Sequence, residues 1–207
     1  MPLRELAGPI GRLEALLDTP ETNVRAAVVF AHPHTEYGGT MHTKVVYQAA
    51  KALARIGCAV LRFNFRGAGA SAGSFTNGPG EIEDFRAALD FMHDRYPSAR
   101  MWAGGMSFGS YVGMTAGAAD PRVSTLIGIA LPVTRYDFAP VATSTKAKFF
   151  IHGERDEICP VREVRQFYAR CEEPKELVVI DAADHLFDGK TSEVADAVEN
   201  LLGDWSG

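Results

Sequence analysis

The segment Gly105-Met106-Ser107-Phe108-Gly109 places a serine between two glycines at the spacing Gly-x-Ser-x-Gly. An apolar run precedes the segment and a helix-like stretch follows it, so the serine is expected at a sharp turn from strand to helix. The glycines leave space where strand and helix meet, since side chains two positions from the serine would collide there. A hydroxyl at a helix N-terminus lies beside backbone N–H groups that favour an oxyanion. The pattern predicts a nucleophile at Ser107; the alternative is a serine that only caps a helix.

A serine nucleophile needs a base to take its proton and a carboxylate to orient that base. His185 follows one apolar run, and Asp156 follows another in the setting His-Gly-x-x-Asp. Both lie where strands of a parallel sheet would end, and the order serine, acid, histidine is the one that such sites use. Asp137, in the loop after the preceding strand, is the alternative acid, because some sites supply the carboxylate one strand earlier. The His-Gly-x-x-Asp setting favours Asp156.

Two backbone N–H groups must hold the oxyanion that forms when a serine attacks a carbonyl. One is expected from Phe108, the residue after the serine, and the other from the loop after an early apolar strand. That loop begins His32-Pro33-His34, and because Pro33 has no N–H, we expect His34 to be the second donor. A metal site at His32, His34 and His42 is the alternative. No carboxylate or cysteine follows these histidines at a recognised ligand spacing, so we expect no metal.

The elements that must position these residues follow from the alternation of short apolar runs with helix-like stretches, which is typical of parallel strands joined by crossover helices. Several runs are apolar almost throughout, as in strands covered on both faces. Strands are predicted at residues 13–17, 26–31, 59–65, 101–104, 125–131, 147–152 and 177–181. Helices are predicted at 43–56, 81–96, from 107 onward, 160–171 and 192–205. The glycine-rich interval 67–80 is predicted to be a surface loop, and such loops often lie beside a site.

The composition narrows the class of protein further. The chain has 207 residues, 46% of them hydrophobic, which fits one domain spanning residues 1–207. Its formal net charge of −5 comes from mixed acids and bases without a basic run, so nucleic acid is not an expected partner. No segment has the roughly 18 apolar residues of a membrane span, and charges interrupt the N-terminal stretch that a signal peptide would need, so no membrane association is expected. Three cysteines without a metal or redox spacing, Cys58, Cys159 and Cys171, favour a cytoplasmic location.

Several motifs together carry a resemblance to a known group. They are His32-Pro33-His34 with Gly38 to His42, Arg62 to Gly67 with Ser71 and Gly73 to Phe75, Gly105 to Gly109, Asp156 and His185. In these residues the chain resembles the small lidless bacterial α/β-hydrolases, predicted serine hydrolases that are distantly similar to dienelactone hydrolases and to the catalytic domains of prolyl oligopeptidases. The resemblance covers nearly the whole chain.

The resemblance implies an α/β-hydrolase fold with a mostly parallel central sheet of about seven strands, an antiparallel first strand, helices on both faces and no cap domain. It also implies a triad of Ser107, Asp156 and His185, and no cofactor. Dienelactone hydrolases use a cysteine nucleophile where this chain has Ser107. Their lactone substrate is therefore not carried over.

Residues 132–146 are all that separates the strands predicted at 125–131 and 147–152, where larger hydrolases insert a cap. A shallow, open site is expected, which favours small or short-acyl esters. The side chains expected in its walls are Tyr37, Met106, Phe108, Tyr136, Phe138 and Leu186.

The sequence thus predicts a carboxylesterase-like serine hydrolase that acts on a small-molecule ester through an acyl-enzyme. Hydrolysis of a thioester or a peptide-like amide by the same triad is the enzyme alternative. A non-catalytic binding protein of this fold is the other alternative. Both a monomer and a homodimer stay open.

Overall fold

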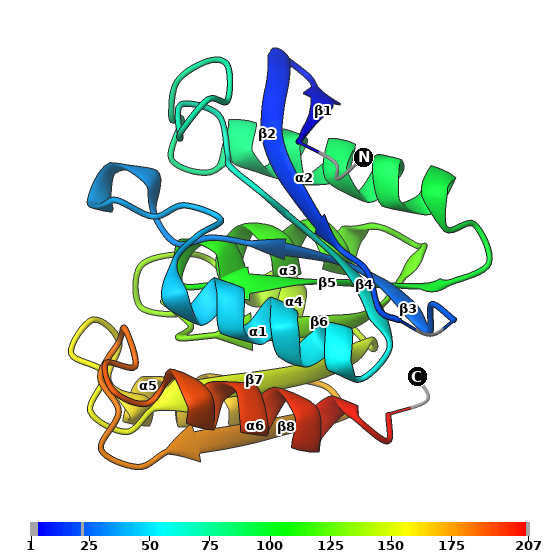
Figure 1. Cartoon of the computed structure of the whole chain (residues 1–207). Helices are drawn as coiled ribbons and strands as arrows, with labels where there is room; N and C mark the ends of the chain where they lie inside the picture. Colours follow the sequence, from blue (N-terminus) through cyan, green and yellow to red (C-terminus); the bar gives the residue numbers. More distant parts are fainter. Residues whose placement is uncertain (1–3, 22, 206–207) are drawn as a thin grey trace.

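The computed structural model describes residues 4–21 and 23–205, in which eight strands form one sheet (Figure 1). The strands are β1 (Glu5–Gly8), β2 (Gly11–Asp18), β3 (Ala26–Ala31), β4 (Cys58–Phe63), β5 (Arg100–Met106), β6 (Val123–Ile129), β7 (Ala147–Gly153) and β8 (Lys175–Ile180). Their spatial order is β1-β2-β4-β3-β5-β6-β7-β8. The β1–β2 and β2–β4 pairs are antiparallel, and every other pair is parallel. The expected mostly parallel sheet is confirmed.

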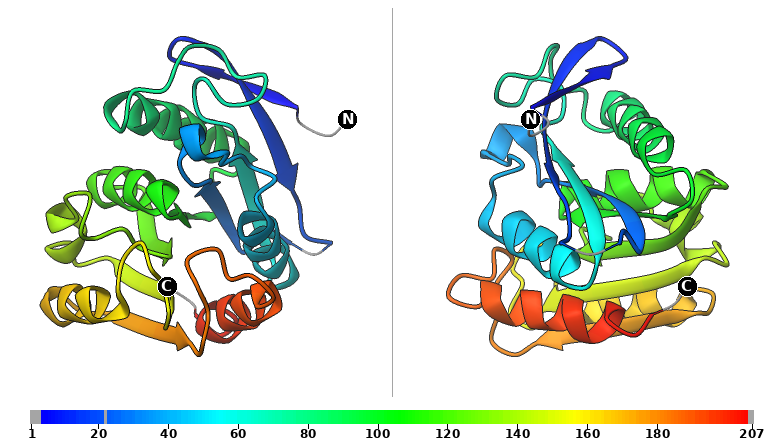
Figure 2. Two further views of the ribbon diagram at one scale, coloured as in Figure 1. Left: turned by 90° about the vertical axis from the view of Figure 1, so that its left-hand side faces the viewer. Right: turned by 45° about the vertical axis from the view of Figure 1, so that its right-hand side comes forward.

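Helices cover both faces of the sheet. They are α1 (Lys44–Arg55), α2 (Pro79–Arg95), α3 (Phe108–Ala119), α4 (Ala139–Ala142), α5 (Val161–Arg170) and α6 (Thr191–Leu202), with a short 3-10 helix η1 (Thr35–Tyr37). The left view of Figure 2 shows α1 and α6 on one side of the sheet and α2, α3 and α5 on the other. None of the helices in the described part of the chain is both long and apolar enough to cross a membrane.

The central strand β3 shows why these runs are apolar almost throughout. All six of its residues are buried. Val29 and Ala31 pack in the core beneath α2 and α3, whereas Val28 and Phe30 pack in the core beneath α1 and α6. Because successive side chains of a strand point to opposite faces, a strand with helices on both sides needs an apolar residue at every position.

The sheet has one strand more than the seven expected. The additional strand, β1, has four residues, of which Leu6 is its buried side chain. It pairs with β2 through a tight turn in which Gly8 lies opposite Gly11. Four residues are too few for an alternating pattern to stand out, and β1 is an edge strand with little apolar surface to bury.

The parallel strands β3 to β8 end at the same edge of the sheet, and the loops at this edge carry the site residues predicted from the sequence. The connection from β6 to β7 contains only the four-residue helix α4. No cap domain is inserted there, as the sequence predicts.

Candidate active site

Ser107 occupies the turn between β5 and α3 in a strained backbone conformation, with φ of 53° and ψ of −122°. A Cβ atom on Gly109 would lie 2.4 Å from the carbonyl oxygen of His32, and one on Gly105 would lie 2.5 Å from the carbonyl oxygen of Gly109. Glycine is therefore required at both positions. The Ser107 side chain makes no capping hydrogen bond to α3, so the alternative of a simple helix cap does not describe it.

Three side chains that are far apart in the sequence form a continuous hydrogen-bonded chain. The Ser107 Oγ atom lies 2.9 Å from Nε2 of His185. The Nδ1 atom of the same imidazole lies 2.7 Å from Oδ2 of Asp156. All three residues are buried, with His185 7% and Ser107 9% exposed. If Nδ1–H donates to the carboxylate, Nε2 is free to accept the serine proton.

Asp156 is held on its other oxygen by the backbone. Its Oδ1 atom accepts hydrogen bonds from the N–H groups of Ile158 at 2.9 Å and Cys159 at 2.8 Å. Burial by itself raises the pKa of the Asp156 carboxyl, but the hydrogen bonds from His185 and Cys159 outweigh this effect, and the pKa lies below its usual value. The carboxylate is therefore ionised and fixed where it can orient His185.

Asp137, the alternative acid, has a different environment. It is exposed, and its Oδ1 atom accepts a hydrogen bond of 2.8 Å from the N–H of Ala139 at the start of α4. The His185 imidazole is contacted by the carboxylate of Asp156.

A second buried histidine supports the carboxylate and was not singled out from the sequence. The Nε2 atom of His152 lies 2.8 Å from the carbonyl oxygen of Cys159 and 3.4 Å from Oδ2 of Asp156. Burial lowers the pKa of His152. The signal was present in the motif His-Gly-x-x-Asp, whose first residue is this histidine.

The two residues expected to supply the oxyanion donors share a cavity with Ser107. His34 and Phe108 both line it, and within the described residues neither backbone N–H donates a hydrogen bond. Their N–H groups are free to bind a ligand oxygen.

The loop that carries His34 is positioned by His32 at the end of β3. His32 Nε2 accepts a hydrogen bond from the N–H of Phe65 at 3.0 Å, and its Nδ1 lies 2.6 Å from the carbonyl oxygen of Pro33. Burial lowers the pKa of His32 to about 4, which keeps its ring neutral near pH 7. A neutral ring can accept at one nitrogen while it donates at the other, so His32 joins the His34 loop to the loop after β4.

The cavity has a volume of about 960 Å³. Of the side chains expected in its walls, it brings together Tyr37, Phe108, Tyr136 and Leu186. Met106 does not belong to the wall. It is fully buried in the core beneath α1 and α6, because the alternation along β5 directs its side chain to that face of the sheet.

Phe138 does not line the cavity either. Its side chain is 3% exposed and packs in the core beneath α2 and α3. Its ring lies edge-on to that of Phe167 in α5, with 5.5 Å between the ring centroids. Phe138 therefore attaches the short connection around α4 to the body of the protein.

Three wall residues, Phe75, Thr76 and Asn77, come from the glycine-rich loop between β4 and α2. From the sequence this interval was expected to be a surface loop of the kind that often lies beside a site, but none of its residues was predicted in the cavity wall. The side chains that determine its path lie in the first turns of α2, where two carboxylates, Glu81 and Asp84, are fully buried.

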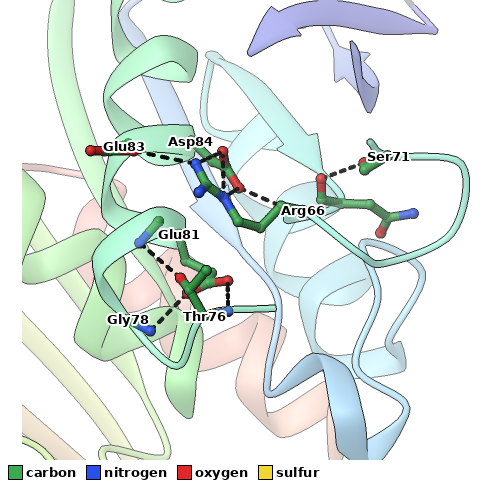
Figure 3. A network of polar contacts seen from close by, with 9 residues as sticks. Arg66, Ser71, Thr76, Gly78, Glu81, Glu83 and Asp84 are labelled. Carbon is green, nitrogen blue, oxygen red and sulfur yellow. Dashed lines mark hydrogen bonds and ion pairs between the residues drawn. The ribbon is translucent and has the colours of Figure 1, made fainter. Parts of the chain in front are cut away.

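These two carboxylates anchor the loop (Figure 3). Glu81 accepts hydrogen bonds from the N–H groups of Thr76 at 2.9 Å and Gly78 at 2.7 Å, and from the Thr76 hydroxyl at 2.8 Å. Asp84 accepts a hydrogen bond from the N–H of Arg66 at 2.9 Å, and its Oδ1 lies 2.7 Å from Nη2 of the same residue. Because a buried carboxylate that loses its partners is costly, these contacts hold the loop in one position.

Comparison with known proteins adds the evolutionary context. The profile of the family described as "serine aminopeptidase, S33" matches residues 22–148. An α/β serine hydrolase homologue from Coxiella burnetii is 35% identical, with a TM-score of 0.91 over 96% of this chain and 95% of that one. A lidless α/β serine hydrolase from Xanthomonas campestris is 37% identical, with a TM-score of 0.88 over 97% and 92%. An uncharacterized protein of Rickettsia prowazekii is 35% identical over 98% of this chain and 89% of its own length.

Proposed function

Since this chain belongs to the serine aminopeptidase S33 family and is a lidless α/β serine hydrolase, we propose that it is a carboxylesterase with a Ser107, His185 and Asp156 triad that cleaves small or short-acyl esters. The observation that supports the proposal most is the continuous chain of hydrogen bonds from Ser107 Oγ through both ring nitrogens of His185 to Asp156. A hydroxyl within hydrogen-bond reach of a base, with that base oriented by a carboxylate, is the arrangement that activates a serine nucleophile.

In the proposed mechanism, Ser107 Oγ attacks the ester carbonyl carbon while His185 Nε2 takes the hydroxyl proton. The N–H groups of His34 and Phe108 hold the resulting oxyanion, each contributing roughly 3 kcal/mol. His185 then gives its proton to the leaving alkoxide, which departs as an alcohol and leaves an acyl group on Ser107. A water molecule attacks this acyl-enzyme while His185 takes one of its protons. His185 then gives that proton to Ser107 Oγ as the bond to the acyl carbon breaks, which releases the acid and restores the free serine. Throughout both halves Asp156 keeps the imidazole oriented and stabilises its charged form.

The preference for small or short-acyl esters rests on the connection between β6 and β7, where no cap covers Ser107. Long lipid chains need an extended apolar channel, whereas this cavity is open and has polar and charged side chains such as Glu36, Asn77 and Arg135 among its walls.

Peptide hydrolysis by the same triad is the second candidate, since the family takes its description from an aminopeptidase. The carboxylates of Glu36 and Glu157 line the cavity, and an N-terminal ammonium group would need a negative partner of this kind. Aminoacyl nitroanilides compared with acyl nitrophenyl esters separate the two activities.

The test of the proposal is labelling of the folded protein by a fluorophosphonate probe together with a chain-length series of 4-nitrophenyl esters. We expect labelling of the wild type and of Ser192→Ala, an exposed serine on α6, and loss of labelling in Ser107→Ala. Turnover is expected to fall from butyrate to palmitate. An unlabelled wild type would indicate a binding protein, and highest turnover on palmitate would contradict the short-acyl preference.

A further inference from the structure

The mechanism proposed above restricts where each half of an ester can lie. The leaving oxygen must lie within reach of His185 Nε2, and the carbonyl oxygen must face the N–H groups of His34 and Phe108. Strands β7 and β8 lie together at one end of the sheet, and the loops after them contribute His185, Leu186, Glu157 and Ile158 to the cavity lining. The acyl group is directed away from the leaving oxygen, and therefore toward the walls built by the loops after β3, β4 and β6.

Those walls are aromatic. The ring of His34 lies 4.4 Å from that of Phe75 and 4.6 Å from that of Tyr37, measured between centroids. Phe108 lies 5.3 Å from Phe75 and 5.5 Å from Tyr136, both in edge-to-face geometry. Five aromatic side chains from four separate segments thus form a continuous set of ring contacts, in which Phe108 is buried behind the other rings. We call this set the aromatic wall: His34, Tyr37, Phe75, Phe108 and Tyr136.

Part of the aromatic wall is available to a ligand. Tyr37 is 81% exposed, and Phe75 and Tyr136 are half-buried. Burial lowers the pKa of His34, so its imidazole is neutral at pH 7 and presents an aromatic face. The rings of the wall still have free edges and faces, and a ring of the ligand can make edge-to-face contacts with them.

The wall is also preorganised. Phe75 precedes Thr76, whose N–H and hydroxyl are both bound by the buried carboxylate of Glu81 (Figure 3). Tyr136 is fixed from the opposite side, since its hydroxyl donates to Oδ1 of Asn77 at 3.3 Å and its ring stacks on Tyr111 at 4.6 Å. Rings held in place before binding lose little conformational entropy when a ligand arrives.

The two charged groups that border the aromatic wall have opposite signs. Glu36 and Arg135 both line the cavity and both are exposed, so one charge of each sign borders the aromatic wall. Selection among acyl groups must therefore come from the shape and the polarity of the rings.

We propose that the aromatic wall is an acyl subsite for a flat, uncharged aromatic ring, so that this hydrolase prefers arylalkanoyl esters to saturated acyl groups of the same size. The inference rests on the proposed function and names the substrate class of that same site. Edge-to-face contact with one or two rings accounts for roughly a tenfold preference.

The experiment compares 4-nitrophenyl 3-phenylpropanoate with 4-nitrophenyl 3-cyclohexylpropanoate. The two esters have the same leaving group and the same number of carbons, and the ring lies far enough from the carbonyl to leave its reactivity unchanged. We expect kcat/KM to be roughly tenfold higher for the phenyl ester. Equal values, or a preference for the cyclohexyl ester, would overturn the aromatic subsite while the hydrolase function stands. If the wild type hydrolyses neither of these esters nor 4-nitrophenyl acetate, the hydrolase function itself is overturned.

Variants of the wall residues test whether the aromatic wall causes the preference for the phenyl ester. Phe75→Leu and Tyr136→Leu are each expected to bring the ratio of the two kcat/KM values toward one, and because both esters are measured on the same variant, any general loss of activity cancels. Tyr47→Leu is the matched control, since Tyr47 is a half-exposed tyrosine of α1 whose ring contacts Lys51 and Arg62 outside the cavity. It should keep the wild-type ratio. A ratio that survives both wall variants, or one that falls equally in Tyr47→Leu, would refute the assignment to the wall.

Discussion

Replacing Asp156 by asparagine tests the proposed triad most sharply, because the substitution changes charge and hydrogen bonding with almost no change in shape. The asparagine oxygen can accept the two hydrogen bonds that the N–H groups of Ile158 and Cys159 now donate to Asp156 Oδ1. Its NH₂ group then takes the place of Oδ2, 2.7 Å from His185 Nδ1. An NH₂ group there can only donate, so Nδ1 becomes the acceptor and the ring proton moves to Nε2. His185 can then no longer take the proton of Ser107.

The magnitude follows from the charge that is lost. During attack His185 becomes an imidazolium, and a unit charge about 4 Å away at an effective dielectric constant near 20 stabilises it by about 4 kcal/mol. At 1.36 kcal/mol per decade this corresponds to about a thousandfold in kcat. The unfavourable tautomer adds roughly another factor of ten, so we expect a loss of about 10⁴, the size seen when a serine protease loses this charge.

The assay is the steady-state hydrolysis of 4-nitrophenyl acetate, with circular dichroism to show that Asp156→Asn is folded. The free energy of unfolding should fall by about 2 kcal/mol, since a charge-assisted hydrogen bond becomes a neutral one. Asp137→Asn is the control, because Asp137 is exposed and only its contact with Ala139 is affected. The reasoning fails if Asp156→Asn keeps kcat within about tenfold of the wild type, or if Asp137→Asn causes the larger loss.

Further predictions concern the residues that position the site. Gly109→Ala would place a Cβ atom 2.4 Å from the carbonyl oxygen of His32, so the turn must move; kcat/KM on the acetate ester should fall by about a hundredfold. The pKa of about 4 for folded His32 lies below the value of 6.5 for the unfolded chain. Only the unfolded state takes up this proton between those pH values, so the free energy of unfolding falls by about 3 kcal/mol as the pH drops from about 6.5 to about 4. Urea denaturation should show this dependence, weakened in His32→Gln. In Glu81→Gln an NH₂ group, which can only donate, would face backbone N–H groups such as that of Gly78. The free energy of unfolding should therefore fall by about 2 kcal/mol in the same urea assay.

How far the sequence predicts the site depends on what fixes each residue. The sequence could predict that Ser107, Asp156 and His185 come together, because each follows a strand of a parallel sheet and the strand ends of such a sheet meet at one edge. The direction of the Met106 side chain was predicted wrongly. Proximity to Ser107 along the chain suggested a wall residue, but the alternation of β5 turns Met106 to the opposite face.

The fold was predicted closely wherever long apolar runs carry the signal, and less well where tertiary contacts decide. Strand β1 is only four residues long and leaves most of its surface exposed, so no pattern marks it. The position of Phe75 depends on buried Glu81 and Asp84. Acidic residues at the start of a helix are usually exposed, so their types alone give no sign that here they organise a loop.

The attachment of the loop after β4 has a consequence for how such an enzyme can diversify. The loop that carries Phe75 is hydrogen-bonded to α2, because Glu81 accepts from the N–H groups of Thr76 and Gly78. Changes within this loop can therefore alter which acyl group is accepted while the bond-breaking groups stay in place. Randomised libraries confined to residues 73–77, with Glu81 and Asp84 retained, should yield folded variants of altered substrate range. The same separation would let paralogues diverge in substrate while sharing one chemistry.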